Sequence, residues 1–129
     1  AQDRMILDLG CGDGKCVALN KDNTANHPIP VNEKCFLNQT TSLCDDNPLV
    51  EFRHYFDTIN FPQWIFVGSD GIEDSFNGDD GLNDFYKEVT NIFRSKHWKI
   101  AIAELNDYLP ILSQKGSGDD MSISGIYNK

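Results

Sequence analysis

The sequence lacks an apolar run long enough for a signal-like or membrane-spanning segment, so we expect no membrane-spanning helix. It is also short of positive charge: 11 Lys and Arg residues stand against 20 Asp and Glu residues, for a net charge of −9. Nucleic acids and anionic membranes are negatively charged, so neither is expected as a partner. The acidic excess suits a protein that collects cations, and equally a protein with ordinary surface carboxylates.

The sequence contains no C-x-x-C pair. Its four cysteines stand at spacings of 5, 19 and 9 residues, at Cys11, Cys16, Cys35 and Cys44. Structural zinc sites usually draw on closely spaced cysteine pairs, so a site of that kind is disfavoured. We expect these side chains to be reduced and buried in a cytoplasmic protein.

The chain has 129 residues with 40% hydrophobic and 11% aromatic content, which is enough for one folded core. We therefore expect residues 1–129 to form a single domain. The length is short for a doubly wound nucleotide-binding fold. Because the sequence begins with Ala, we expect it to be a piece of a longer protein.

Apolar patterns and turn signals predict strands over residues 4–9, 15–20, 51–56, 63–69 and 121–127, and residues 35–43 are compatible with another. The Gly12-Asp13-Gly14 turn predicts that the first two strands form a hairpin. Four consecutive apolar residues in the segment 63–69 predict a strand that is buried on both faces.

Between the last two of these strands the apolar period changes to that of a helix. Two stripes have this spacing, one from Leu82 to Phe93 and one from Trp98 to Leu112. We expect Asp79 or Asp80 to cap the first helix and Pro110 to kink or end the second. Two consecutive helices before the last strand predict an α+β fold of antiparallel strands, and not a β-α-β alternation.

The segment "ILDLGCGDGKC" also matches the glycine-rich turn that holds S-adenosylmethionine in many methyltransferases. Such a turn must lie between a strand and a helix, because the helix N-terminus and free backbone N–H groups bind the cofactor. The polar, proline-containing segment 20–30 follows too soon for a long helix. A methyltransferase therefore remains the less favoured alternative.

Four acidic residues stand at strand ends or turns: Asp13, Asp70, Asp74 and Asp119. Each alone is typical of turn or cap chemistry. Together they offer the oxygen ligands that Mg²⁺ and Mn²⁺ prefer, held by rigid strand ends with glycines beside them.

The segments "FVGSDGIEDSF" and "GSGDDMSISGIY" resemble the metal-dependent protein phosphatase 2C family. That family has a strand ending in Asp-Gly with a second Asp four residues on, two long helices, and then an Asp-Asn-x-Ser-like motif before a final strand. Its hairpin with Gly-Asp-Ser or Gly-Asp-Gly is similar to Gly12-Asp13-Gly14, and "PVNEKCFLNQTTSLCDDNP" resembles a bacterial branch. Here Asp120 replaces the commoner Asn, which leaves Asp119 as the expected ligand.

The resemblance implies a partial α-β-β-α sandwich and the hydrolysis of phosphoserine or phosphothreonine in proteins by water bridging two Mn²⁺ or Mg²⁺ ions. It implies Asp70, with Gly71, and Asp119 at the main metal centre, and Asp13 and Asp74 with Asp70 at a third, weaker ion. It assigns no role to His27, His54 or His97.

The family also begins with a segment whose Asp-Gly pair bridges the two main ions, and nothing upstream of Asp13 matches it. We therefore expect this chain to be the C-terminal portion of the domain and to be inactive alone. The expected partners are a phosphoprotein substrate and either a second copy or the missing N-terminal segment. The alternative is a non-catalytic, phosphatase-like interaction module.

Overall fold

The computed structural model describes residues 6–10, 14–30, 44, 46–47, 52–59 and 61–129. The elements in this part of the chain are β1 (Ile6–Gly10), β2 (Lys15–Leu19), β3 (Ala25–Asn26), β4 (Arg53–Asp57), β5 (Trp64–Gly68), α1 (Asp70–Glu73), α2 (Asp79–Ser95), α3 (Trp98–Lys115) and β6 (Ile123–Tyr127). The fold is α+β, with α2 and α3 placed consecutively before the last strand, as predicted.

The strands form two antiparallel sheets. One has the order β3-β2-β5-β6, and the other pairs β1 with β4. The prediction of a β1–β2 hairpin is therefore wrong, since β1 and β2 belong to different sheets. The reason is that each strand finds a partner far along the chain: β2 pairs with β5 along its whole length, and β1 pairs with β4.

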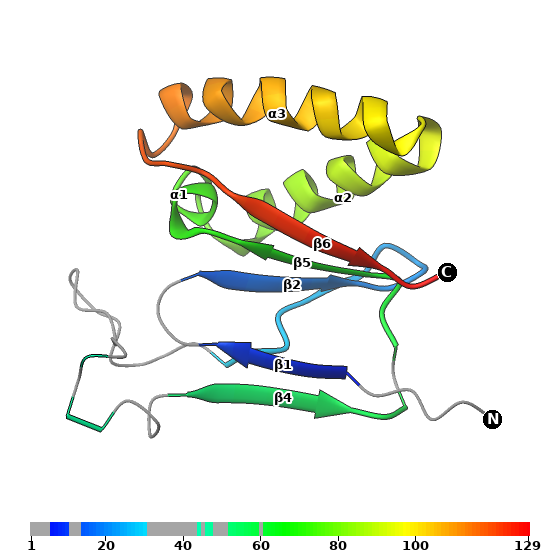
Figure 1. The fold of residues 1–129 in the computed structure, drawn as a ribbon, viewed down its shortest axis with the longest axis vertical. Coiled ribbons are helices and arrows are strands. Elements are labelled where there is room, and N and C mark those ends of the chain that lie inside the picture. The colour runs from blue at the N-terminus through cyan, green and yellow to red at the C-terminus, as the bar shows by residue number, and fades with distance from the viewer. Residues whose placement is uncertain (1–5, 11–13, 31–43, 45, 48–51, 60) are drawn as a thin grey trace.

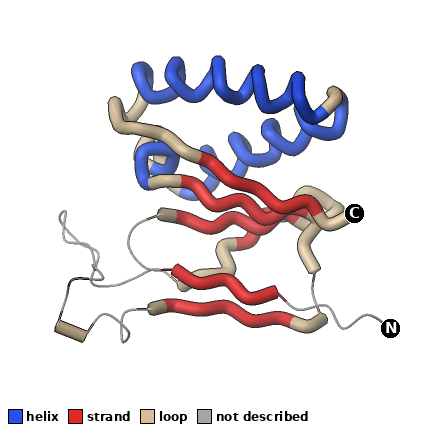
Figure 2. The backbone as a smooth tube through the Cα atoms, viewed as in Figure 1, coloured by secondary structure: helices blue, strands red, loops and turns tan. Residues whose placement is uncertain are grey.

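The molecule is layered. Helices α2 and α3 cover one face of the four-stranded sheet, and the β1–β4 sheet lies on the side away from the helices (Figure 1). The separation of helical and strand layers is plain when the chain is coloured by secondary structure (Figure 2). These layers correspond to the α-β-β part of the sandwich that the resemblance implies.

The core lies between the four-stranded sheet and the helices. Its buried cluster consists of Val17, Leu19, Trp64, Phe66, Ile72, Leu82, Phe85, Tyr86, Val89, Leu109 and Leu112. Stacked aromatic rings join the sheet to the helices. The ring centroids of Trp64 and Phe66, both on β5, are 5.6 Å apart, and those of Phe66 and Tyr86, which lies on α2, are 5.1 Å apart. Fully burying a side chain of this size stabilises the fold by about 1.5–3 kcal/mol, so this layer is the main source of stability.

Strand β5 is buried on one face and not on both, contrary to the prediction. Trp64, Phe66 and Gly68 are buried, whereas Val67 is 49% exposed. On β6, Ile126 is 68% exposed. Strand β2 is buried from Cys16 to Leu19, so the second sheet layer covers β2 and leaves the outer part of the sheet open. Self-association through such a surface stays a prediction, which sedimentation at several concentrations would test.

The helix ends also differ from expectation. Gly78, with a φ of 84°, stands at the N-cap of α2, and Asp79 is the first helical residue. The Asp79 carboxylate accepts a hydrogen bond from Lys15 and does not cap the helix. Pro110 does not end α3, since the helix continues to Lys115, and a kink at Pro110 stays a prediction. Leu109 and Leu112 pack against the core on either side of Pro110, which offsets the one backbone hydrogen bond that proline removes.

Other expectations are met only in part. Cys16 is buried, whereas Cys44 is exposed, and Cys11 and Cys35 lie outside the described residues. The whole segment 35–43 also lies outside them, so the strand considered there stays a prediction. Within the described part of the chain, no helix combines the length and apolarity needed to cross a membrane.

Candidate metal centre

Two of the acid-bearing motifs, those of Asp70 and Asp119, meet at one end of the four-stranded sheet, and Gly14 of the third motif lies at the same end. Strand β5 runs between β2 and β6, so that Gly68 lies opposite Lys15 on one side and Ile123 on the other. Asp70 follows Gly68 by two residues, and the Gly12–Gly14 turn directly precedes Lys15. The segment of Asp119 precedes Ile123. Strand pairing therefore brings Gly14, Asp70 and the segment of Asp119, which are far apart in the sequence, to the same edge.

Two of the three motifs are in direct contact. A Cβ built on Gly71 would lie 2.6 Å from the carbonyl oxygen of Asp120 and 3.2 Å from the Cβ of Asp119. The backbone N–H of Ser69 donates to the carbonyl of Ser122 at 3.0 Å. The Asp70-Gly71 turn and the segment that carries Asp119 thus pack backbone against backbone, which only a glycine at position 71 permits.

The described residue of the third motif, Gly14, lies beside strand β5. Asp13 itself lies outside them, but a Cβ on Gly14 would be 3.0 Å from the carbonyl oxygen of Gly68. Gly14, the last residue of this motif, is therefore packed against the strand that leads to Asp70.

The acidic side chains themselves are exposed. Asp70 begins α1, and its Oδ1 accepts a hydrogen bond from the N–H of Gly71 at 2.8 Å. Asp74 is the C-cap of the same short helix. Asp119 lines a pocket of about 390 Å³ together with Asp120 and residues of α3 such as Leu109. Asp70 and Asp119 thus have exposed side chains and stand on segments that contact each other at Gly71.

A complete metal site is not assembled by the described residues, among which no group of three His, Cys, Asp or Glu side chains is placed to hold an ion. Asp74 therefore does not complete a three-carboxylate set with Asp70 and Asp119. One or two carboxylates with water molecules are a usual protein ligand set for Mg²⁺, so Asp70 and Asp119 fit a divalent cation as partial ligands. Their role as metal ligands, like that of Asp13 and Asp74, stays a prediction.

The structure adds Lys15, which the sequence did not single out. Its Nζ donates to Oε1 of Glu73 at 2.7 Å and to Oδ1 of Asp79 at 2.6 Å, so one ammonium joins β2 to α1 and to the start of α2. Burial alone would lower the pKa of Lys15, but its bonds to the two carboxylates outweigh burial and raise it. The sequence could not identify this role, because the two partners of Lys15 lie 58 and 64 residues further along the chain.

This ion pair predicts a modest pH effect. The hydrogen bond from Lys15 holds the pKa of Asp79 below its usual value near 3.8, so the pair stabilises the fold above that pH and is lost as the pH falls through the lowered pKa. Because Asp79 is more than half exposed, we expect Asp79→Asn to cost less than about 1 kcal/mol near pH 6.

The measurement is the urea midpoint of the wild-type chain and of Asp79→Asn at pH 6 and at pH 3. The difference between the two proteins should shrink at the lower pH. Asp80→Asn is the matched control, because Asp80 lies in the same helical turn, and it should show a smaller change. An equal pH dependence in both variants would contradict the role of Lys15.

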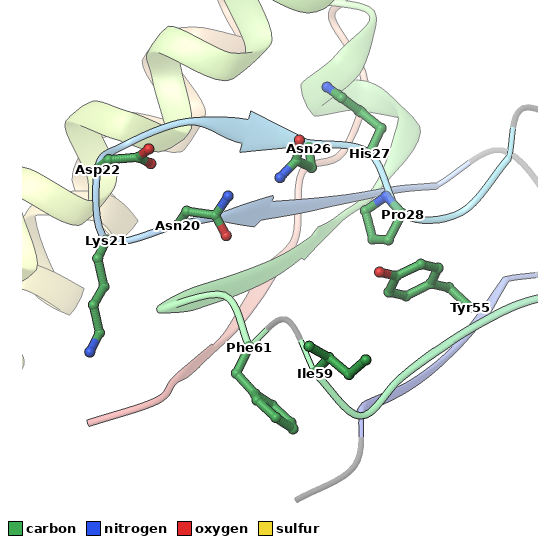
Figure 3. A pocket seen from close by; sticks show the side chains of 9 residues that line it. All are labelled: Asn20, Lys21, Asp22, Asn26, His27, Pro28, Tyr55, Ile59 and Phe61. Atoms are coloured by element: carbon green, nitrogen blue, oxygen red, sulfur yellow. The ribbon is translucent and has the colours of Figure 1, made fainter.

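A second pocket, of about 810 Å³, lies at the opposite end of β2. It is lined by Asn20, Lys21, Asp22, Asn26, His27, Pro28, Tyr55, Ile59 and Phe61. The side chains of Lys21 and His27 point away from one another, so the polar groups do not converge on one point (Figure 3). His27 instead bonds Asn83 through Nε2 at 2.9 Å, a structural contact.

Comparison with known families decides the assignment. A family model described as protein phosphatase 2C matches residues 1–110. The chain belongs to the protein phosphatase 2C family. Comparisons with curated proteins and with solved structures gave no match.

The phosphatase 2C match includes the Gly12–Gly14 turn and the Asp70–Asp74 motif but ends before Asp119. The contact of Gly71 with Asp119 and Asp120 joins this last motif to the matched part. The methyltransferase alternative lacks the element that it requires, since strand β2 stands after the glycine turn where a cofactor-binding helix would have to begin.

Proposed function

We propose that this chain supplies the later metal-binding motifs of a phosphatase 2C domain that hydrolyses phosphoserine and phosphothreonine in proteins with Mn²⁺ or Mg²⁺. The observation that carries the proposal is the contact between the Asp70-Gly71 turn and the segment of Asp119. These motifs lie 49 residues apart in the chain and have no local reason to meet. Family membership supports the reaction class.

In this proposal Asp70 and Asp119 hold divalent cations, with Asp13 and Asp74 contributing to a further ion. When bound, paired cations lower the pKa of a water molecule between them and neutralise phosphoryl oxygens. The task of the chain is then to keep its carboxylates at a rigid edge of the sheet. Gly71 serves this by letting two backbones approach closely.

A covalent enzyme intermediate is not needed. The nearest hydroxyl is that of Ser69, whose Oγ donates to the carbonyl of Asp120 at 3.3 Å and accepts from the N–H of Ser122 at 3.1 Å. A serine nucleophile requires an adjacent general base, and no hydrogen bond from a histidine to Ser69 is present among the described residues. Ser69 therefore has a structural role in this proposal.

We further propose that the chain is inactive without the family segment that carries the bridging Asp-Gly pair. Carboxylates gathered at one site repel one another unless cations compensate them, so an incomplete set binds metal weakly. A cytoplasmic, bacterial-type enzyme is part of the proposal and rests on the resemblance and on cysteine usage. The second candidate, a non-catalytic interaction module, is favoured by the lack of a three-ligand group in the described part of the chain.

The deciding experiment is phosphate release from p-nitrophenyl phosphate and from a phosphothreonine peptide by the full-length parent protein. We expect activity with Mn²⁺ or Mg²⁺ and none after EDTA treatment, with recovery when the cation is restored. A folded parent protein that binds no divalent cation by calorimetry would establish the interaction module in its place.

A further inference from the structure

The segment that carries Asp119 is rich in glycine, so its backbone can adopt many conformations. It reads Lys115-Gly-Ser-Gly-Asp-Asp, with two glycines in six residues, and Gly118 has a φ of +79°. Such a segment loses much conformational entropy when it is ordered. Something must therefore hold Asp119 beside the Asp70-Gly71 turn.

Hydrogen bonds from the hydroxyls of Ser117 and Ser75 fix this segment against α1. Ser117 Oγ donates to the carbonyl of Gly71 at 2.8 Å, and it accepts from the N–H of Asp119 at 3.3 Å. Ser75 Oγ donates to the same carbonyl at 2.9 Å, and it accepts from the N–H of Ser117 at 3.1 Å. Ser75 Oγ also lies 3.3 Å from Ser117 Oγ, so the two hydroxyls, the carbonyl of Gly71 and the backbone N–H groups of Ser117 and Asp119 form one hydrogen-bonded cluster.

Neighbouring residues also constrain the segment that carries Asp119. A Cβ on Gly116 would collide with the Ser75 side chain, so a glycine is needed where the segment passes α1. On the other side, Ser113 Oγ donates to the carbonyl of Asp119 at 2.7 Å. The backbone of Asp119 is therefore fixed through both its N–H and its carbonyl, while its carboxylate is left exposed for other contacts.

We propose that Ser117 is a positioning residue of the metal centre, which holds Asp119 at the spacing from Asp70 that a shared divalent cation requires. This inference rests on the proposed function. It assigns Ser117 no contact with metal or substrate; Ser117 acts through Asp119. Its loss should therefore affect the affinity for the cation more than the rate at saturating cation.

The test compares Ser117→Ala with Ser95→Ala in the full-length protein. Ser95 also donates to a backbone carbonyl, that of Ile92, but at the far end of α2. We expect Ser117→Ala to raise the Kd for Mn²⁺ by about tenfold, the equivalent of one or two lost hydrogen bonds, while kcat at saturating Mn²⁺ changes little. Ser95→Ala should leave the Kd unchanged.

Amide hydrogen exchange without metal provides a readout independent of activity. Ser117→Ala should speed exchange at Asp119, and Ser95→Ala should not. If the wild-type protein binds no Mn²⁺, the proposed function fails, and the exchange at Asp119 still shows whether Ser117 fixes this segment. Unchanged exchange at Asp119, or an unchanged Kd in a protein that does bind Mn²⁺, would overturn the inference.

Discussion

Replacing Asp70 by Asn is expected to lower metal-dependent phosphate release by the full-length protein by at least about 100-fold, because loss of a metal ligand removes several kcal/mol of charge stabilisation. The amide keeps the shape of the carboxylate but carries no charge. Asp70 stands at the start of α1, directly after the buried strand β5, so the backbone that presents it is not expected to move.

Asp119→Asn should act in the same direction, because both side chains stand on the two segments that pack against each other. The control is Asp84→Asn, which removes the same charge from an exposed position on α2 that pairs with Lys87. An exposed pair of this kind is worth about 0–1 kcal/mol, and the control should keep full activity. The measurements are kcat/KM and the Kd for Mn²⁺.

These variants also separate the two candidate functions. Full activity in Asp70→Asn would remove Asp70 from the metal centre and leave the phosphatase proposal without its central residue. Lost cation binding with an unchanged urea midpoint would show that the carboxylates serve the ion and not the fold.

Replacing Gly71 by Ala is expected to have the second large effect, and it acts through backbone geometry. The new Cβ would lie 2.6 Å from the carbonyl oxygen of Asp120, a backbone atom that cannot rotate away. Either α1 or the Asp119 segment must move. Overpacking of this kind typically costs about 1–3 kcal/mol, and here it should also weaken Mn²⁺ binding because it separates Asp70 from Asp119.

The control for this prediction is Gly81→Ala, within α2. Its Cβ would meet the side chain of Phe76 at 3.3 Å, which can adjust, and Ala is favoured over Gly in a helix by about 1 kcal/mol. The free energy of unfolding in urea should fall for Gly71→Ala and should stay close to the wild-type value for Gly81→Ala. A Gly71→Ala protein with wild-type stability and Mn²⁺ affinity would show that the two segments are not held together tightly.

Local patterns were enough to predict most of the regular elements. The helical stripes predicted α2 and α3, because a helix that packs on a sheet must repeat its apolar residues at helical spacing. The apolar segments predicted β2 and β5 with small errors at their ends. Helix capping was predicted less well: Gly78 is the N-cap of α2, and the carboxylate of Asp79 bonds Lys15 on a distant strand.

Strand partners and buried faces were predicted poorly, because both depend on segments that are far apart in the sequence. A glycine turn such as Gly12–Gly14 favours a hairpin locally, yet β1 and β2 pair with β4 and β5. Likewise, the residues of an apolar strand do not show whether a second layer covers each of them, and Val67 is 49% exposed although β5 is apolar. Both outcomes depend on segments far along the chain, which compete for the same hydrogen bonds and the same apolar surface.

The sequence by itself determined the α+β class, the two consecutive helices, the family resemblance and the identity of the candidate carboxylates, because periodicity and short motifs are local properties. Only the tertiary structure decided that the segment of Asp119 packs against Gly71, which hydroxyls bond the backbone there and which lysine joins α1 to α2. Convergence of Asp70 with the segment of Asp119 arises from the pairing of β5 with β6 and from the close approach at Gly71. Distances between residues that are remote in the sequence exist only once the chain has packed.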